Sequence, residues 1–166
     1  MVAAQHLPAR TTATEHHGGD HDAHFRAAIM LGHTLITPGE TDTRLFVPSW
    51  GLDIEYWASH RLGIGLHTDI ELQDFVVLNQ NQEEVERNDP FILTIDGLYR
   101  PWKNLILMGG PGLELEQGHA FWLFRAGFEY EVPVGTSFDL FPSIFYDQRF
   151  DGYSTLTIGL GVGRRF

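Results

Sequence analysis

The feature that most constrains this chain is the alternation of apolar and polar residues between Gly51 and Leu72. Apolar side chains occupy every second position on both sides of a short break at residues 57–60. Acidic residues, glycine and histidine fill most of the positions between them. A side-chain period of two is typical of a β-strand with one apolar and one polar face. The break is only long enough to reverse the chain, so this stretch predicts an antiparallel hairpin.

The same rhythm continues along the chain, with turn residues between segments of about ten to fourteen residues. The longest and most charged connection is predicted at residues 79–90. Closing eight such strands in next-neighbour order leaves no exposed sheet edge. The predicted fold class is therefore all-β, an eight-stranded antiparallel up-and-down barrel. We expect its strands at residues 25–36, 45–57, 61–77, 91–100, 105–116, 119–132, 137–147 and 153–166.

The distribution of aromatic residues indicates which face of the barrel points outwards. They gather near the strand ends on both sides of an aliphatic band, as amphipathic rings do at lipid headgroups. We therefore expect a transmembrane β-barrel whose apolar face meets lipid and whose polar face lines the lumen. The alternative is a soluble lipocalin-like barrel with the apolar face inside, binding an apolar small molecule. The expected belts are Tyr56, Trp57, Tyr99, Trp102, Phe128, Tyr130 and Phe166 at one end, and Phe46, Phe75, Tyr146 and Tyr153 at the other.

Glycine and proline give opposing signals about this barrel. Eight glycines within the expected strands lie on the polar parity, which indicates a face short of room. The interior of an eight-stranded barrel is just wide enough for side chains. Pro48, Pro111 and Pro142 lie within the expected strands. Each lacks the N–H that a strand donates, so a β-bulge is one way to accommodate them.

Composition narrows the classes of protein. The sequence contains no stretch of 18 apolar residues, so no transmembrane helix is expected. A formal net charge of −11 argues against nucleic acid as a partner. Cysteine is absent, which rules out disulfides and thiolate metal sites. The residues near Met1 contain no apolar segment of the kind found in signal peptides. If the protein is exported, we expect this sequence to be the mature chain.

The last strand carries a resemblance to a known family. The end of the chain, TLTIGLGVGRRF, alternates apolar residues and closes on Phe166. It resembles the terminal strand of bacterial outer-membrane barrels, and residues 25–166 are similar to small eight-stranded OmpX- and OmpA-type barrels. Arg164 departs from that pattern. The resemblance implies a bacterial outer-membrane location, contact with outer-membrane lipid and recognition of the last strand by the assembly machinery.

Two groups of residues are candidates for a divalent cation; no other cofactor is expected. The first belongs to residues 1–23, predicted as a disordered His- and Asp-rich tail ahead of the barrel at residues 24–166. Imidazoles and carboxylates at this density can chelate Zn²⁺, Ni²⁺ or Cu²⁺. The alternative is a solubilising tail without a metal role. The candidate ligands are His16, His17, Asp20, His21, Asp22 and His24.

The second group lies on the lumen parity. If both termini are periplasmic, five carboxylates line the outer half of the lumen with too few nearby bases to pair them. They are expected to be hydrated, to bind a divalent cation through oxygen ligands, or to form a proton or cation pathway. The inner half also contains arginines, so its acids are expected to form a structural ion-pair network. The outer carboxylates are Asp69, Glu71, Glu114, Glu116 and Asp147; the inner acids are Asp53, Glu55, Glu129, Glu131 and Asp139.

No motif for catalysis is present. No serine shares a strand with His33 or His119 at useful spacing, and His67 beside Asp69 is expected to belong to a polar network. We therefore predict a non-enzymatic barrel with a packed polar lumen, acting as a structural or accessory subunit with a membrane-protein partner or in binding metal ions. A lipid-modifying outer-membrane enzyme stays open as an alternative.

Overall fold

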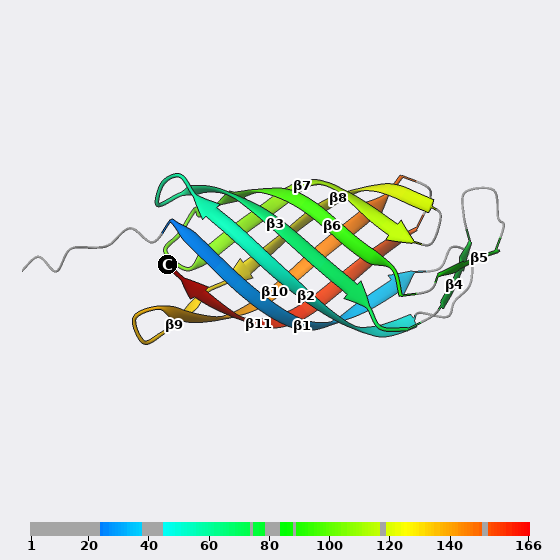
Figure 1. Ribbon diagram of the computed structural model, residues 1–166, viewed down its shortest axis with the longest axis horizontal. Helices are drawn as coiled ribbons and strands as arrows, with labels where there is room; N and C mark the ends of the chain where they lie inside the picture. The colour runs from blue at the N-terminus through cyan, green and yellow to red at the C-terminus, as the bar shows by residue number, and fades with distance from the viewer. Residues whose placement is uncertain are drawn as a thin grey trace, which may run out of the picture.

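The computed structural model describes residues 24–37, 45–73, 75–78, 84–87, 89–116, 119–150 and 153–166. Within these ranges, eight long antiparallel strands form one closed barrel, shown side-on in Figure 1. No apolar helix of membrane-spanning length occurs in this part of the chain. The barrel strands are β1 Phe25–Thr37, β2 Leu45–Trp57, β3 Leu62–Glu71, β6 Phe91–Tyr99, β7 Leu105–Glu116, β8 His119–Tyr130, β10 Phe138–Arg149 and β11 Ser154–Arg165.

Each barrel strand pairs with its neighbours in chain order, and the last strand pairs with the first. The seam between β1 and β11 runs from the pair Arg26–Arg165 to the pair Thr37–Ser154. The backbone N–H of Phe166 also donates to the carbonyl oxygen of Phe25 at 2.9 Å. The predicted up-and-down barrel is thus confirmed, and both ends of the barrel domain lie at one end of it, here called the termini end (Figure 1).

The third predicted strand was too long. The barrel strand β3 ends at Glu71, whereas we expected it to continue to Val77. Residues Phe75–Leu78 (β4) pair with Glu84–Arg87 (β5) in a separate hairpin beyond the barrel end opposite the termini, here called the hairpin end (Figure 1). The run from Phe75 to Leu78 is apolar at every position. This loss of alternation was a signal that the two-faced strand had ended.

Pro142 accounts for the division of another strand. The pairing of β8 with β10 stops at the pair Glu129–Ser143, and β9 (Val132–Val134) then continues along β10 in the same register. Pro142 lies opposite the interruption, where it has no N–H to donate. The sixth predicted strand, residues 119–132, therefore covers β8 and the first residue of β9.

The other two strand prolines are accommodated in a similar way. Pro111 lies at a gap in the β6–β7 ladder, and the register is the same on both sides of that gap. Pro48 lies one residue beyond the end of the β2–β3 ladder. A bulge would shift the register by one residue. The register is instead kept, and backbone hydrogen bonds are omitted locally.

The two faces of the strands are sorted as the sequence predicted. Apolar side chains face outwards; Leu31 and Trp122, for example, are 67% and 62% exposed. Charged side chains face the lumen, where Asp96 and Glu114 are 0% exposed. A soluble carrier would need the opposite orientation, because its apolar face would have to line the cavity. The orientation therefore gives the lipocalin-like alternative no support.

Two of the predicted belt aromatics are in the lumen. Trp57 and Tyr153 are buried, whereas Tyr56, Tyr99 and Trp102 are exposed at the termini end. Trp57 follows Tyr56 directly, and successive residues of a strand point to opposite faces, so the two rings could not both face lipid. The side chain of Phe75 lies outside the described part of the structure.

The lumen is narrow and contains apolar as well as charged groups. Ala28, Met30, Phe141 and Phe145 form a small apolar cluster inside it. Between Met30 and Phe141 on the adjacent strands, the inward face of β11 carries Gly161, where an added Cβ would lie 2.1 Å from the Phe141 ring. Glycine at this inward position leaves room for a side chain from the neighbouring strand, as the sequence predicted.

The lipid-facing assignment predicts a depth-dependent effect of charge. We expect Leu66→Arg, in the middle of β3, to lower the free energy of unfolding by about 2–4 kcal/mol. Leu62→Arg is the matched control, because it lies at the end of the same strand, where the expected loss is about 0–1 kcal/mol. Urea unfolding in phospholipid vesicles measures both values. Equal losses at the two positions would contradict a membrane-spanning β3.

The crowded lumen predicts that Gly161→Ala destabilises the barrel. The new methyl group would push the Phe141 ring off its site, and we expect a loss of about 1–3 kcal/mol. Gly97→Ala is the control, since its added Cβ would meet only the Gly109 oxygen at 3.7 Å. The two variants are compared by unfolding in the same vesicles. If Gly161→Ala is as stable as Gly97→Ala, the lumen has room for a methyl group beside the Phe141 ring, which would contradict the tight packing.

Candidate functional site

The charged lumen is the candidate functional site. Alternation along each strand places its side chains, because the polar parity of all eight strands points inwards. Three buried arginines, Arg26, Arg125 and Arg149, follow one another from the termini end to the hairpin end. Each of them binds carboxylates from other strands. The site has three levels, each named after its arginine.

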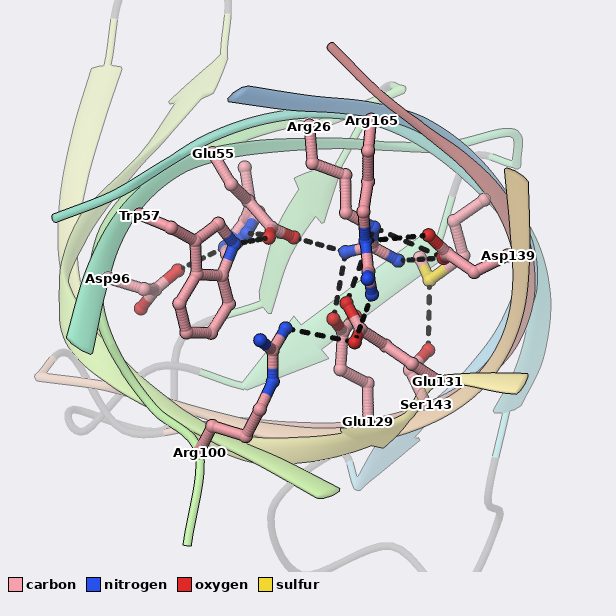
Figure 2. A network of polar contacts seen from close by, with 12 residues as sticks. Arg26, Glu55, Trp57, Asp96, Arg100, Glu129, Glu131, Asp139, Ser143 and Arg165 are labelled. Atoms are coloured by element: carbon pink, nitrogen blue, oxygen red, sulfur yellow. Dashed lines mark hydrogen bonds and ion pairs between the residues drawn. The ribbon is translucent and has the colours of Figure 1, made fainter. Parts of the chain in front are cut away.

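The Arg26 level joins four strands. The Arg26 side chain donates from Nε and Nη2 to Asp139 Oδ1 at 3.1 and 2.8 Å, and from Nη1 to Glu129 Oε1 at 2.8 Å. Nη1 also pairs with Glu55. The flat face of the guanidinium lies 4.2 Å from the centre of the Phe141 ring. Figure 2 looks into this level and shows the network crossing the lumen from wall to wall.

Glu131 extends this level towards the termini end. Its Oε2 accepts a hydrogen bond from Arg100 Nη2 at 2.9 Å and also pairs with Arg165. On the neighbouring wall, Trp57 Nε1 donates to Glu55 Oε2 at 2.8 Å. These contacts, together with those of Arg26, confirm the predicted ion-pair network for four of the five inner acids, Glu55, Glu129, Glu131 and Asp139.

The Arg125 level lies in the middle of the barrel. Arg125 on β8 binds Asp147 on the adjacent β10 through two parallel hydrogen bonds of 2.7 and 2.8 Å. Its Nη1 lies 2.7 Å from Asp69 Oδ2 on β3, three strands away around the barrel. The Phe145 ring covers one face of the guanidinium at 4.0 Å. One arginine therefore ties two distant walls together.

A histidine pair lies beside this level. His67 Nδ1 is 2.7 Å from Asp96 Oδ2, which also accepts from the Thr94 hydroxyl at 2.5 Å. Asp53 lies opposite His67 in the β2–β3 ladder. His67 thus belongs to a buried polar network, as the sequence predicted, although its partner is Asp96 on the next strand and not Asp69.

The Arg149 level closes the hairpin end. Arg149 pairs with Glu114 and lies 3.8 Å from Glu71 on the opposite wall. The Tyr153 hydroxyl donates to Glu114 at 2.7 Å. Burial raises the pKa of the Tyr153 phenol well above its ordinary value, which keeps this donor protonated. Arg87 of the β4–β5 hairpin reaches back to Glu114 at 3.6 Å, so the hairpin is tied to the lumen.

The structure corrects the premise behind the predicted cation site. Asp69 and Asp147 pair with Arg125, Glu114 pairs with Arg149, and Glu71 lies 3.8 Å from the Arg149 guanidinium, so these carboxylates do have bases beside them. Two of the bases were missed because Arg87 lay in the predicted charged connection and Arg149 in a predicted turn. The side chain of Glu116 lies outside the described residues.

Metal binding itself stays a prediction. Among the residues that the structure describes, no three His, Asp or Glu side chains are grouped to hold a metal ion. His16, His17, Asp20, His21 and Asp22 of the predicted tail lie outside that part of the chain. His24 is described, and its Nδ1 is 3.0 Å from the backbone oxygen of Trp57.

Arg149 was identifiable in principle from the sequence. It lies two residues after Asp147 and therefore shares the lumen parity. Extending the seventh strand by two residues would have placed both side chains at the hairpin end of the lumen. No comparable signal exists for Arg87, because its position depends on how the separate β4–β5 hairpin is placed at the hairpin end of the barrel.

Comparison with known proteins gives a fold and no closer relative. No family model matches the sequence, and no curated protein matches it. The crystal structure of Ail, the attachment invasion locus protein of Yersinia pestis, has a TM-score of 0.54 at 17% identity, covering 85% of this chain and 98% of Ail. Neisserial surface protein A has a TM-score of 0.56 at 11% identity, covering 86% and 97%.

A third neighbour is the N-terminal β-barrel domain of Pseudomonas aeruginosa OprF, with a TM-score of 0.51 at 15% identity, covering 85% of this chain and 97% of that domain. The fold of the chain is that of the small eight-stranded outer-membrane β-barrels. This confirms the fold resemblance seen in the sequence. The neighbours are proteins of the bacterial outer membrane, the location predicted for this chain.

The middle level predicts a large effect of a single substitution. Arg125→Gln would leave Asp69 and Asp147 buried without their common partner, and we expect a loss of about 3–5 kcal/mol in unfolding free energy. Changing both aspartates to Asn in the same chain should restore most of that loss. Arg164→Gln is the charge-matched control, because Arg164 stacks on Phe138 and Phe166 outside the lumen.

Urea unfolding, followed by tryptophan fluorescence, gives the free energies of all three variants. If Arg125→Gln loses no more stability than Arg164→Gln, the arginine does not hold the middle of the lumen together.

Proposed function

We propose that this protein is a non-conducting barrel of the bacterial outer membrane that acts as a structural or accessory subunit. The observation that supports this most directly is Arg125, which crosses the lumen to bind Asp147 on β10 and Asp69 on β3. An open pore needs a continuous path for water and ions. A guanidinium held by carboxylates from two walls occupies the middle of that path.

The other two levels support the same proposal. Arg26 joins β1 to β2, β8 and β10, and Arg149 on β10 pairs with Glu114 on β7 and approaches Glu71 on the opposite β3. Separating the two partners of a buried ion pair is costly, because removing one of them leaves an uncompensated buried charge at about 3–5 kcal/mol. We therefore propose a permanently filled lumen.

With the lumen filled, two outer surfaces of the protein are available to lipid or to a protein partner. One is the outward aliphatic band with its aromatic belts, which we propose contacts outer-membrane lipid. The other is the β4–β5 hairpin at the hairpin end, which Arg87 ties to Glu114. We propose that a membrane-protein partner of an accessory subunit meets one of these surfaces. No catalytic role is proposed.

Electrical recording tests the proposal. Purified protein inserted into planar lipid bilayers should give no stable conductance steps in molar potassium chloride, because all three levels remain paired. Insertion is verified in parallel by co-flotation of the protein with vesicles, and passage of small neutral solutes is measured by liposome swelling. Stable conductance steps or solute uptake by the native protein would show that the lumen is open and would overturn the proposal.

A further inference from the structure

A cavity opens at the termini end of the lumen. Its volume is about 880 Å³, within the range of small-molecule sites. The walls come from the start of β1, the end of β11 and the turns that join β2 to β3, β6 to β7 and β9 to β10. The Arg26 level forms its floor. We call this cavity the vestibule; its charged and aromatic lining includes Arg26, Trp57, Arg100, Lys103, Glu131 and Arg165.

The vestibule is cationic in a protein whose formal net charge is −11. Four arginine and lysine side chains line it, together with His24 and His60, and Glu131 is the acid among the lining residues. The Glu131 side chain is 2% exposed and already binds two arginines, whereas Arg100 and Arg165 are 17% and 35% exposed. The accessible charge in the vestibule is therefore positive.

Two arginines converge on the vestibule from different walls. Figure 2 shows Arg100 and Arg165 approaching each other across the lumen, with Glu131 between them. Arg100 lies 4.1 Å above the Trp57 ring. Its Nη2 donates to Glu131 at 2.9 Å and its Nη1 only weakly to the His60 backbone oxygen at 3.5 Å, while its Nε is buried without a hydrogen-bond partner among the described residues. Guanidinium groups bind carboxylates and phosphates through paired N–H donors. The vestibule thus presents donor groups and space for a further oxygen acceptor.

We propose that the vestibule binds a small multivalent oxyanion, such as a phosphate ester or a polycarboxylate. Arg100 and Arg165 would hold it from two sides, with Lys103 at the entrance. This site goes beyond the structural role proposed above and does not depend on it, because an oxyanion at the end of a filled lumen requires no transport. The same chemistry fits a free solute or the phosphate of a lipid headgroup at the membrane edge.

Trp57 provides a reporter inside the site. The chain has four tryptophans, so a Trp50→Phe, Trp102→Phe and Trp122→Phe background leaves Trp57 alone. This protein, refolded in nanodiscs of zwitterionic lipid, is titrated with pyrophosphate and with citrate. We expect a saturable change in Trp57 fluorescence. An anion that binds Arg100 would change the position or the charge of the guanidinium that lies above the indole ring. Calorimetric titration of the native chain should give the same dissociation constant.

Charge variants locate the binding. Lys103→Gln together with Arg100→Gln should weaken pyrophosphate binding by roughly tenfold or more, because charge-assisted hydrogen bonds are lost. Lys103→Gln alone, at an exposed position, should weaken it to a lesser extent without affecting the fold. Arg164→Gln is the matched control, since it removes the same charge one residue from Arg165 on the outward face. Thermal unfolding verifies that each variant is folded.

The outcomes separate the proposal from its alternatives. No fluorescence change and no heat with either anion would overturn it, and so would equal weakening by Arg164→Gln, which would indicate unspecific charge attraction. A nanodisc of anionic phospholipid without added solute distinguishes the two sources. If that lipid alone produces the Trp57 response and blocks pyrophosphate, the oxyanion is a headgroup; if pyrophosphate still binds, it is a free solute.

Discussion

The structure depends on the way in which a buried guanidinium is satisfied. Arg26, Arg125 and Arg149 each meet carboxylates at their edges and an aromatic ring at one face. An arginine suits this position because its planar fork binds carboxylates in pairs while its flat surface stacks on a ring. A lysine would supply neither feature. The repeated arrangement neutralises acids from most of the strands, and it does so in a tube too narrow to hydrate them.

The narrowness of that tube has visible effects on the sequence. Inward glycines lie beside large side chains, as Gly161 lies beside Phe141. The missing side chain on one strand provides the space that the large side chain on the next strand fills. The outward face has no such restriction, because lipid adapts to any apolar surface. The two faces therefore differ in kind: the outer one needs only apolar character, whereas the inner one needs a matched set of shapes and charges.

The sequence predicted the outer face well and the inner face in part. Alternation along Gly51–Leu72 and its repeats determined the barrel, the strand order and the orientation of the faces. The prediction failed at β4 and β5, where the alternation of apolar and polar residues stops. Two strands that pair only with each other in a protruding hairpin need no apolar face, so the sequence does not mark them. The same limit applies to the site. Arg26 and its acids followed from parity, but Arg87 reaches Glu114 from β5, in a hairpin whose placement no local pattern encodes.

The Arg26 contacts also span the seam between β1 and β11. Arg26 lies on the first strand, yet its partners Glu129 and Asp139 lie on β8 and β10, on the far side of the last strand. These contacts therefore hold the β1–β11 seam closed from inside the lumen. Arg165 on β11 pairs with Glu131 and approaches Asp139. The last strand is therefore also fixed by ion pairs of its own. Closing the β1–β11 seam therefore also brings the charges of the Arg26 level into their ion pairs, so barrel closure and charge pairing at the termini end are coupled.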